Sequence, residues 1–218
     1  MKKEKEKSLD PKNMEHYLEF NTRLKILQKL GYIDEHNLVT LKGKGAREIG
    51  TTDCVLISEL LVSNILEKLN ESEIIGFISG FCSNKNEIDF NCNFKMTPQF
   101  KDTYNKFKAI FDNILKIEES YNFEDNKYDR RVTFSIYKAM KSWMEGKSFS
   151  SIIKETELEE GKLYSLILRI YMFLEEIINF YDNLENKYMC EKYENIKKLL
   201  MRDIMAKESL YLQDSINI

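Results

Sequence analysis

Apolar residues recur at helical spacing along most of the chain, and this pattern predicts a mainly helical protein. Four leucines between residues 18 and 30 predict a first helix over residues 14–30, and Gly31 would end it because glycine readily adopts a left-handed conformation. Two short extended segments follow, around residues 32–33 and 38–41, with a polar turn between them. They predict a small β-hairpin beside the first helix, an arrangement typical of the closing half of a winged-helix domain.

The rest of the chain, from residue 43 onward, shows only helical patterns. Proline at position 98, directly after Thr97, is typical of the first turn of a helix. The sequence contains only two prolines and eight glycines, too few for the many turns of an all-β protein. We therefore expect an all-α fold, a helical bundle with a short β-hairpin near the N-terminus. The expected helices are 53–69, 70–84, 97–122, 133–145, 148–155, 159–184 and 189–206, with polar connections at 85–96 and 123–130.

Charge is nearly balanced over the 218 residues. Charged residues make up 32% of the chain and the net charge is −3, whereas general nucleic-acid binders carry a basic excess. A local basic site is still compatible with this balance. Residues 1–13 are highly charged and lack an apolar core, which indicates a flexible tail rather than a signal peptide. No run of 18 apolar residues occurs, so we expect no contact with a membrane.

The cysteines and histidines do not follow the spacing of a metal site. No CxxC pair occurs, and two histidines cannot complete a zinc pattern with such distant cysteines. We expect no bound metal, and free thiols in a reducing, intracellular compartment. The residues concerned are Cys54, Cys82, Cys92, Cys190, His16 and His36.

The stretch "LGYIDEHNLVTLKGKGAREIG" at residues 30–50 resembles a phosphate-binding loop at first sight. A P-loop needs a glycine where Leu38 stands and a serine or threonine where Gly45 stands. The dinucleotide fingerprint fails as well, because Glu48 occupies the place of its third glycine. We interpret the stretch as structural, a hairpin that leads into a helix start, and we identify no catalytic residue in the chain.

Arg169 is the single charged residue in "LYSLILRIYMFL", residues 163–174. A helix that is apolar almost all round should be largely enclosed, and an enclosed guanidinium needs a partner. That partner could be a carboxylate inside the bundle, or a phosphate or base of a bound strand. Two nearby features likewise fit either a role in packing or a role in binding nucleic acid. The segment 148–170 fits either a helix-turn-helix or an ordinary helix pair, and three aromatic residues of the long helix could stack on bases or pack in the core (Tyr164, Tyr171 and Phe173).

Four segments in this order resemble one family. They are "RLKILQKLGYIDEHNLVTLKGKGAREI", "VLISELLVSNIL", "SWMEGKSFSSIIKETELEEGKL" and "KKLLMRDIMAKESLYL". Together they are similar to the C-terminal DSHCT region of the exosome-associated DExH RNA helicases, of the TRAMP-complex and superkiller types. The resemblance runs from about Thr22 to Leu212.

The resemblance implies that the chain corresponds to one part of a larger, multidomain helicase. In the full-length family, RecA-like domains bind ATP and Mg²⁺, and a winged helix and a helical bundle complete a ring around single-stranded RNA, which is fed 3′ to 5′ into the exosome. By this likeness residues 14–42 are the end of the winged helix and residues 43–212 the DSHCT bundle, with a ratchet helix at about 160–184. Residues 213–218 are a tail. The implied partners are RNA, the RecA-like core, and the exosome with its adaptor proteins, in the nucleus or alternatively in the cytoplasm.

The resemblance also assigns the candidate RNA-binding residues. A ratchet arginine of the family falls on Arg169, and Lys162 lies near the entrance of the same helix. Ser165 stands where nuclear members carry a basic residue, and Met172 where they carry an acid. Because the chain has no ATPase motif, we expect it neither to hydrolyse ATP nor to unwind RNA by itself, whether it is an excised domain or a gene product without a motor. The alternative is a protein-interaction module that docks on RecA-like domains or cofactors and has no RNA affinity of its own.

Overall fold

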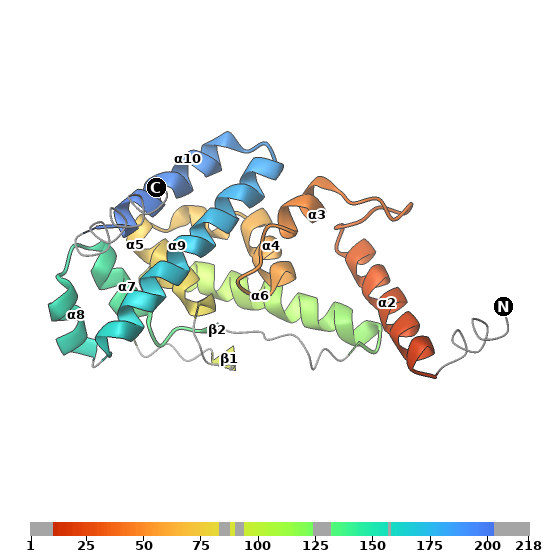
Figure 1. Ribbon diagram of the computed structural model, residues 1–218, viewed down its shortest axis with the longest axis horizontal. Helices are drawn as coiled ribbons and strands as arrows, with labels where there is room; N and C mark the ends of the chain where they lie inside the picture. The colour runs from red at the N-terminus through yellow and green to blue at the C-terminus, as the bar shows by residue number, and fades with distance from the viewer. Residues whose placement is uncertain (1–10, 83–87, 90–93, 124–131, 157, 203–218) are drawn as a thin grey trace, which may run out of the picture.

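The computed structural model describes residues 11–82, 88–89, 94–123, 132–156 and 158–202. Helices make up nearly all of the regular structure in this part of the chain, which confirms the all-α class (Figure 1). The elements are α2 (Pro11–Lys29), α3 (Leu41–Ala46), α4 (Cys54–Val62), the 3₁₀ helix η1 (Ile65–Lys68), α5 (Glu71–Ile78), the 3₁₀ helix η2 (Ser79–Phe81), β1 (Ile88–Asp89), α6 (Pro98–Ser120), β2 (Val132–Thr133), α7 (Tyr137–Met144), α8 (Phe149–Thr156), α9 (Glu160–Asn183) and α10 (Lys187–Leu200).

The expected β-hairpin is reduced to a turn with a single antiparallel bridge, between Ile33 and Val39. The Asp34 carboxylate shapes this turn, since it accepts hydrogen bonds from two backbone amides that follow it, at 2.8 Å each. A second strand cannot extend, because Thr40 already caps α3 through the amide of Gly43. Gly31 has the positive φ of 77° that was expected at the end of the first helix.

The prediction of one long helix over residues 53–69 is wrong, because the helix ends at Val62. The Ser63 hydroxyl donates to the carbonyl of Leu60 at 2.7 Å, and Asn64 adopts a left-handed φ of 52°. A short 3₁₀ helix, η1, follows this break and still buries Leu66. The apolar spacing continues across the break, which is why the pattern alone suggests an unbroken helix.

The remaining elements lie close to their predicted places. Asn70 caps α5 by accepting the amide of Glu73 at 2.9 Å, but the Glu73 carboxylate bonds the Thr97 hydroxyl instead of completing a capping box. Thr97 in turn caps α6 as expected, with Pro98 in its first turn. The next helix, α7, begins four residues later than predicted because Val132 and Thr133 pair with β1 in a parallel register. The last helix, α10, ends at Leu200 rather than near residue 206 as predicted, and Met201 and Arg202 follow it outside the helix.

A cluster of phenylalanines forms the centre of the bundle. The Phe77 ring of α5 lies 5.3–6.0 Å, centroid to centroid, from four other rings. Such tilted and edge-on pairs add to the free energy gained from burial. The four partners come from η2, from two turns of α6 and from the segment before α7, so that one side chain links α5 to all three (Phe81, Phe100, Phe107 and Phe134). Figure 1 shows α9 and α10 lying side by side over this core.

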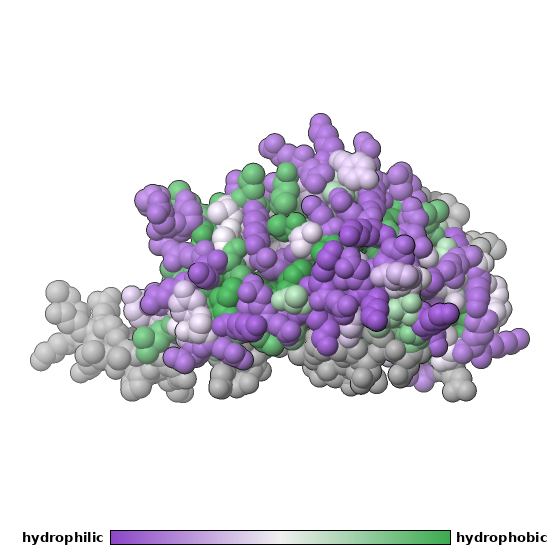
Figure 2. All heavy atoms as spheres, turned by 180° about the vertical axis from the view of Figure 1, so that it is seen from behind, coloured by the Kyte–Doolittle hydropathy of each residue, from purple (hydrophilic) through white to green (hydrophobic). Residues whose placement is uncertain are grey.

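The first helix, α2, extends from one end of the molecule (Figure 1). The segment that follows it is held to the bundle by the Tyr32 hydroxyl, which bonds the Val55 carbonyl and the Glu59 carboxylate at 3.1 and 2.9 Å. Lys42 also pairs with Glu59. The face of the molecule that points away from the viewer in Figure 1 is mostly hydrophilic, with hydrophobic side chains interspersed in the half that holds α2 (Figure 2). The division at residue 42 between a winged-helix part and a bundle stays a prediction, and most of the two predicted tails lies outside the described residues.

None of the helices described by the structure is both long and apolar enough to cross a membrane.

Candidate nucleic-acid interface

The long helix α9 buries one side in the bundle and leaves a stripe on its other side open. Leu163, Ile167 and Ile170 are fully buried. In contrast, Ser165 is exposed and Met172 keeps 61% of its surface in solvent. The expectation that this helix is largely enclosed is therefore only partly right. The open stripe is the part of the helix that a strand could reach.

Arg169 is half-buried, and its contacts tie α9 to the end of η2. Its Nη1 donates to the backbone carbonyl of Cys82 at 2.8 Å. A backbone carbonyl was not among the partners expected from the sequence, which were a carboxylate of the bundle or a bound strand. Arg169 therefore has a structural contact in addition to any role in binding.

Lys162, Ser165 and Arg169 share one side of the N-terminal half of α9, because residues three, four and seven apart on a helix lie above one another. Lys162 is exposed and its Nζ lies 2.9 Å from the Glu159 carboxylate. An exposed ion pair of this kind contributes little free energy, so the lysine can exchange its partner for another anion. The structure thus brings the three predicted residues to one face, with Arg169 partly withdrawn towards Cys82.

The C-terminal half of the helix carries acidic side chains instead. Glu175 pairs with Lys197 of α10 at 2.8 Å. Glu176 accepts hydrogen bonds from the amides of Gly50 and Thr51 at 3.1 and 3.0 Å, and from the Thr51 hydroxyl at 2.7 Å. The loop before α4 is held by this carboxylate. Sequence reasoning missed this function, since nothing local to Glu176 indicates a partner 125 residues away.

The three aromatic residues of α9 belong mainly to the core. Phe173 is fully buried. Tyr164 and Tyr171 are half-buried and pack against the same core, and Lys197 covers the Tyr171 ring at 4.7 Å from its centroid. Of the three rings, only the exposed part of Tyr164 is therefore left to stack on a base. The preceding helix, α8, packs on α7 through Phe149 and Trp143. The choice between a helix-turn-helix and an ordinary helix pair for residues 148–170 stays open.

The glycine-lysine stretch serves packing. Lys42 bonds the Leu30 carbonyl at 2.7 Å, and Gly43 lies directly against the Tyr32 backbone. A side chain at Gly45 would meet Phe180 of α9. Lys42, Gly43 and Gly45 thus serve packing at the start of α3. In the described part of the chain, no group of three or more histidine, cysteine, aspartate or glutamate residues is placed to hold a metal ion.

Replacing Arg169 with alanine should lower the free energy of unfolding by about 1–3 kcal/mol, because the buried Cys82 carbonyl loses a charged donor. Urea denaturation followed by circular dichroism measures this change. Lys162→Ala is the matched control, since an exposed lysine should alter stability by less than about 0.5 kcal/mol. Equal stability of the two variants would show that the Cys82 contact contributes nothing.

Comparison with known proteins places these elements in a family. Residues 36–207 match the model of the DSHCT (NUC185) domain. The chain is 28% identical over 199 residues to "mRNA transport homolog 4" of Caenorhabditis elegans, which covers 90% of this chain and 19% of that protein. It is 24% identical over 197 residues to "ATP-dependent RNA helicase mtr4" of Schizosaccharomyces pombe (89% and 17%), and 23% identical over 197 residues to "Exosome RNA helicase MTR4" of Homo sapiens (89% and 18%).

The chain spans about a fifth of the length of these curated relatives. The matched region begins in the turn before α3 and extends past the end of α10, so it includes α9 and its open stripe. Most of the chain is therefore covered by one domain model, and the chain belongs to the DSHCT (NUC185) domain family.

Proposed function

We propose that this chain is the non-catalytic C-terminal domain of an exosome-associated ATP-dependent RNA helicase. In this function α9 lies beside single-stranded RNA, and the bundle closes one side of the RNA channel during 3′ to 5′ unwinding and RNA decay. A RecA-like motor binds ATP and Mg²⁺ and moves the strand. The bundle holds the strand between steps. Its further partners are the exosome and its adaptor proteins, in the nucleus or alternatively in the cytoplasm.

The single observation that carries this proposal is the open stripe on the N-terminal half of α9 that presents Lys162, Ser165 and Arg169, in a chain of this family. Lys162 and Arg169 are two cations on one side of the helix, and Ser165 between them is exposed and small. A phosphate backbone can approach such a surface without displacing a bulky side chain. The relatives named as RNA helicases support the choice of RNA as the ligand.

The charge along α9 also suggests how far the contact extends. The Asp182 carboxylate lies beyond Met172 on the exposed side of the helix, and it would repel phosphates. We therefore propose that the strand crosses the N-terminal half of α9 and leaves the helix near Met172. Contact with phosphate alone is independent of base sequence and weakens as salt is added.

Ser165→Arg should strengthen RNA binding, because it adds a guanidinium that can donate hydrogen bonds to phosphate on the exposed stripe, one turn before Arg169. We expect the affinity for a fluorescein-labelled oligouridylate to rise several-fold. The slope of the logarithm of affinity against the logarithm of salt should steepen by about 0.7, the value for one more phosphate contact on a single strand. Fluorescence anisotropy over a range of salt concentrations measures both changes.

The matched control is Asn113→Arg, which adds the same charge to an exposed position of α6. If both variants gain equally, the effect is one of net charge and the stripe has no special part in binding. If wild-type chain and Ser165→Arg both fail to bind RNA at low salt, the proposed contact of α9 with RNA is wrong.

A protein-interaction module is the second candidate, and exposed apolar side chains favour it. Six of the large hydrophobic residues that remain exposed lie on α2 and in the segment from residue 38 to 41. Clustered exposed apolar residues commonly mark a surface that another protein covers. This module would dock on the RecA-like core or on cofactors, and it would show no salt-dependent binding of RNA by itself. The residues are Tyr17, Leu18, Phe20, Leu38, Val39 and Leu41.

A further inference from the structure

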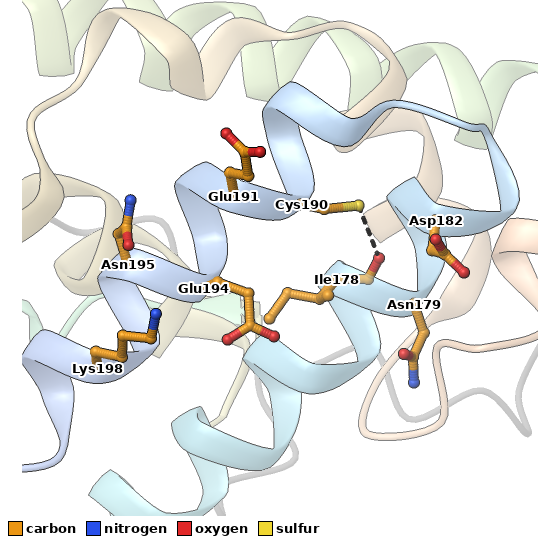
Figure 3. A pocket seen from close by; sticks show the side chains of 8 residues that line it. All are labelled: Ile178, Asn179, Asp182, Cys190, Glu191, Glu194, Asn195 and Lys198. Atoms are coloured by element: carbon orange, nitrogen blue, oxygen red, sulfur yellow. Dashed lines mark hydrogen bonds between the residues drawn. The ribbon is translucent and has the colours of Figure 1, made fainter.

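An open groove of about 550 Å³ lies between the C-terminal half of α9 and the facing side of α10 (Figure 3). Ile178 and Cys190 are half-buried and form its floor, and the Cys190 thiol donates to the Ile178 carbonyl at 3.6 Å. Cys190 and Glu194 extend from α10 towards α9 (Figure 3). The groove lies beyond the half of α9 that carries Lys162 and Arg169, and it forms no part of the proposed RNA contact.

The rim of this groove carries an excess of negative charge. Asp182, Glu191 and Glu194 line it, and Lys198 is the one basic residue among the lining side chains. Within the described part of the chain none of the three rim carboxylates forms a salt bridge, unlike Glu175 beside the groove, which pairs with Lys197. The rim is therefore able to accept cations from outside the chain.

The chemistry of Cys190 indicates the same electrostatic environment. Burial, followed by the charge of Asp182 and to a smaller extent those of Glu194 and Glu191, raises the pKa of its thiol. The three carboxylates thus act on the groove floor as well as on the solvent. A phosphate backbone would be repelled from this surface, whereas arginine and lysine side chains would be attracted to it.

Two large apolar side chains of α10 are exposed outside the set that lines the groove. Tyr188 and Leu199 are 69% and 55% exposed. They share the outer stripe of α10 with the rim residue Glu191, because positions 188, 191, 195 and 199 follow helical spacing. A tyrosine and a leucine beside an apolar floor offer contact area to a partner that is not wholly polar.

We propose that this groove binds a basic and partly apolar segment of a partner protein. Its arginine or lysine side chains pair with Asp182, Glu191 and Glu194, and an apolar residue enters above Ile178 and Cys190. Tyr188 and Leu199 contact the segment at the two ends of the rim. This surface is separate from the RNA-binding stripe, so it can be occupied while the strand is held.

The test uses a short fluorescein-labelled peptide in which arginine alternates with leucine, titrated with the whole chain and followed by anisotropy. The variant Glu191→Lys/Glu194→Lys reverses two rim charges. We expect it to bind the peptide at least about tenfold more weakly. The matched control is Asp112→Lys/Glu119→Lys, which makes the same change of net charge at exposed positions of α6 and should bind as the wild type does.

A charge swap supplies the second arm. A peptide in which glutamate replaces arginine should bind the Glu191→Lys/Glu194→Lys variant more tightly than it binds the wild type. The proposal is overturned if the arginine peptide does not bind, if the two double variants weaken binding equally, or if the glutamate peptide gains nothing.

Discussion

Gly43→Ala should lower the free energy of unfolding by about 3 kcal/mol, although alanine is ordinarily the better helix former. A Cβ atom at this position would lie 2.2 Å from the carbonyl oxygen of Tyr32 and 2.8 Å from a methyl group of Val39. The carbonyl cannot move away freely, because it accepts hydrogen bonds from the amide and the hydroxyl of Thr40 at 3.0 and 3.1 Å. Either the clash remains or these bonds are lost.

The matched control is Gly161→Ala in the first turn of α9, where no heavy atom lies within 4 Å of the new Cβ. This variant should be more stable than the wild type by up to about 1 kcal/mol, because alanine loses less conformational entropy on folding. Thermal unfolding measures both changes, and a loss of 3 kcal/mol corresponds to a midpoint lower by roughly 6–12 °C. If Gly43→Ala gained stability as the control does, close packing would not be the reason for the glycine.

This pair of variants also answers the question raised by the glycine-lysine stretch. The motif comparison excluded a phosphate loop because Leu38 and Gly45 stand at the wrong places. The motif comparison could not reveal that Gly43 packs against the Tyr32 backbone. Tyr32 lies eleven positions earlier, and the turn between the two residues brings their backbones together. Local patterns report on local structure, and a backbone contact across a turn depends on three-dimensional geometry.

The same distinction explains which parts of the fold could be predicted. The start of α6 at Pro98 follows from capping chemistry, and both ends of α9 lie within one residue of the range predicted from apolar spacing. Both signals are local. The break at Asn64 was missed because Leu66 and Leu69 continue the apolar spacing, even though the backbone reverses at a left-handed residue.

The candidate site was predicted in part, for a related reason. The sequence identifies Arg169 as an unusual charge in an apolar helix, and the resemblance identifies the helix. The Cys82 carbonyl that accepts the hydrogen bond from the Arg169 Nη1 lies 87 residues earlier, and no pattern in either segment connects the two residues. The groove between α9 and α10 was missed as well, because nothing in the sequence distinguishes its rim residues from other surface charges until the two helices are placed side by side.

Trp143→Ala should lower the free energy of unfolding by about 3–5 kcal/mol, because it empties a fully buried site where three parts of the chain meet. The indole nitrogen donates to the Leu200 carbonyl at 2.9 Å, and the Phe149 ring packs edge-on at 6.1 Å. The Arg202 guanidinium lies 3.8 Å from the centroid of the indole ring. Trp143 thus fixes the end of α10 to α7 and α8, and circular dichroism during urea denaturation measures its contribution.

A double-mutant cycle separates the ring contact of Arg202 from its backbone contacts. Arg202 also donates to the Trp143 carbonyl at 3.1 and 2.7 Å and to the Lys147 carbonyl, and these bonds do not need the indole. Trp143→Phe weakens the ring contact and keeps the carbonyl, so with Arg202→Met it should give a coupling of about 1 kcal/mol. A coupling of zero would mean that Arg202 holds α7 through the backbone alone, and that the stability lost on replacing Trp143 comes from the cavity and the Leu200 bond.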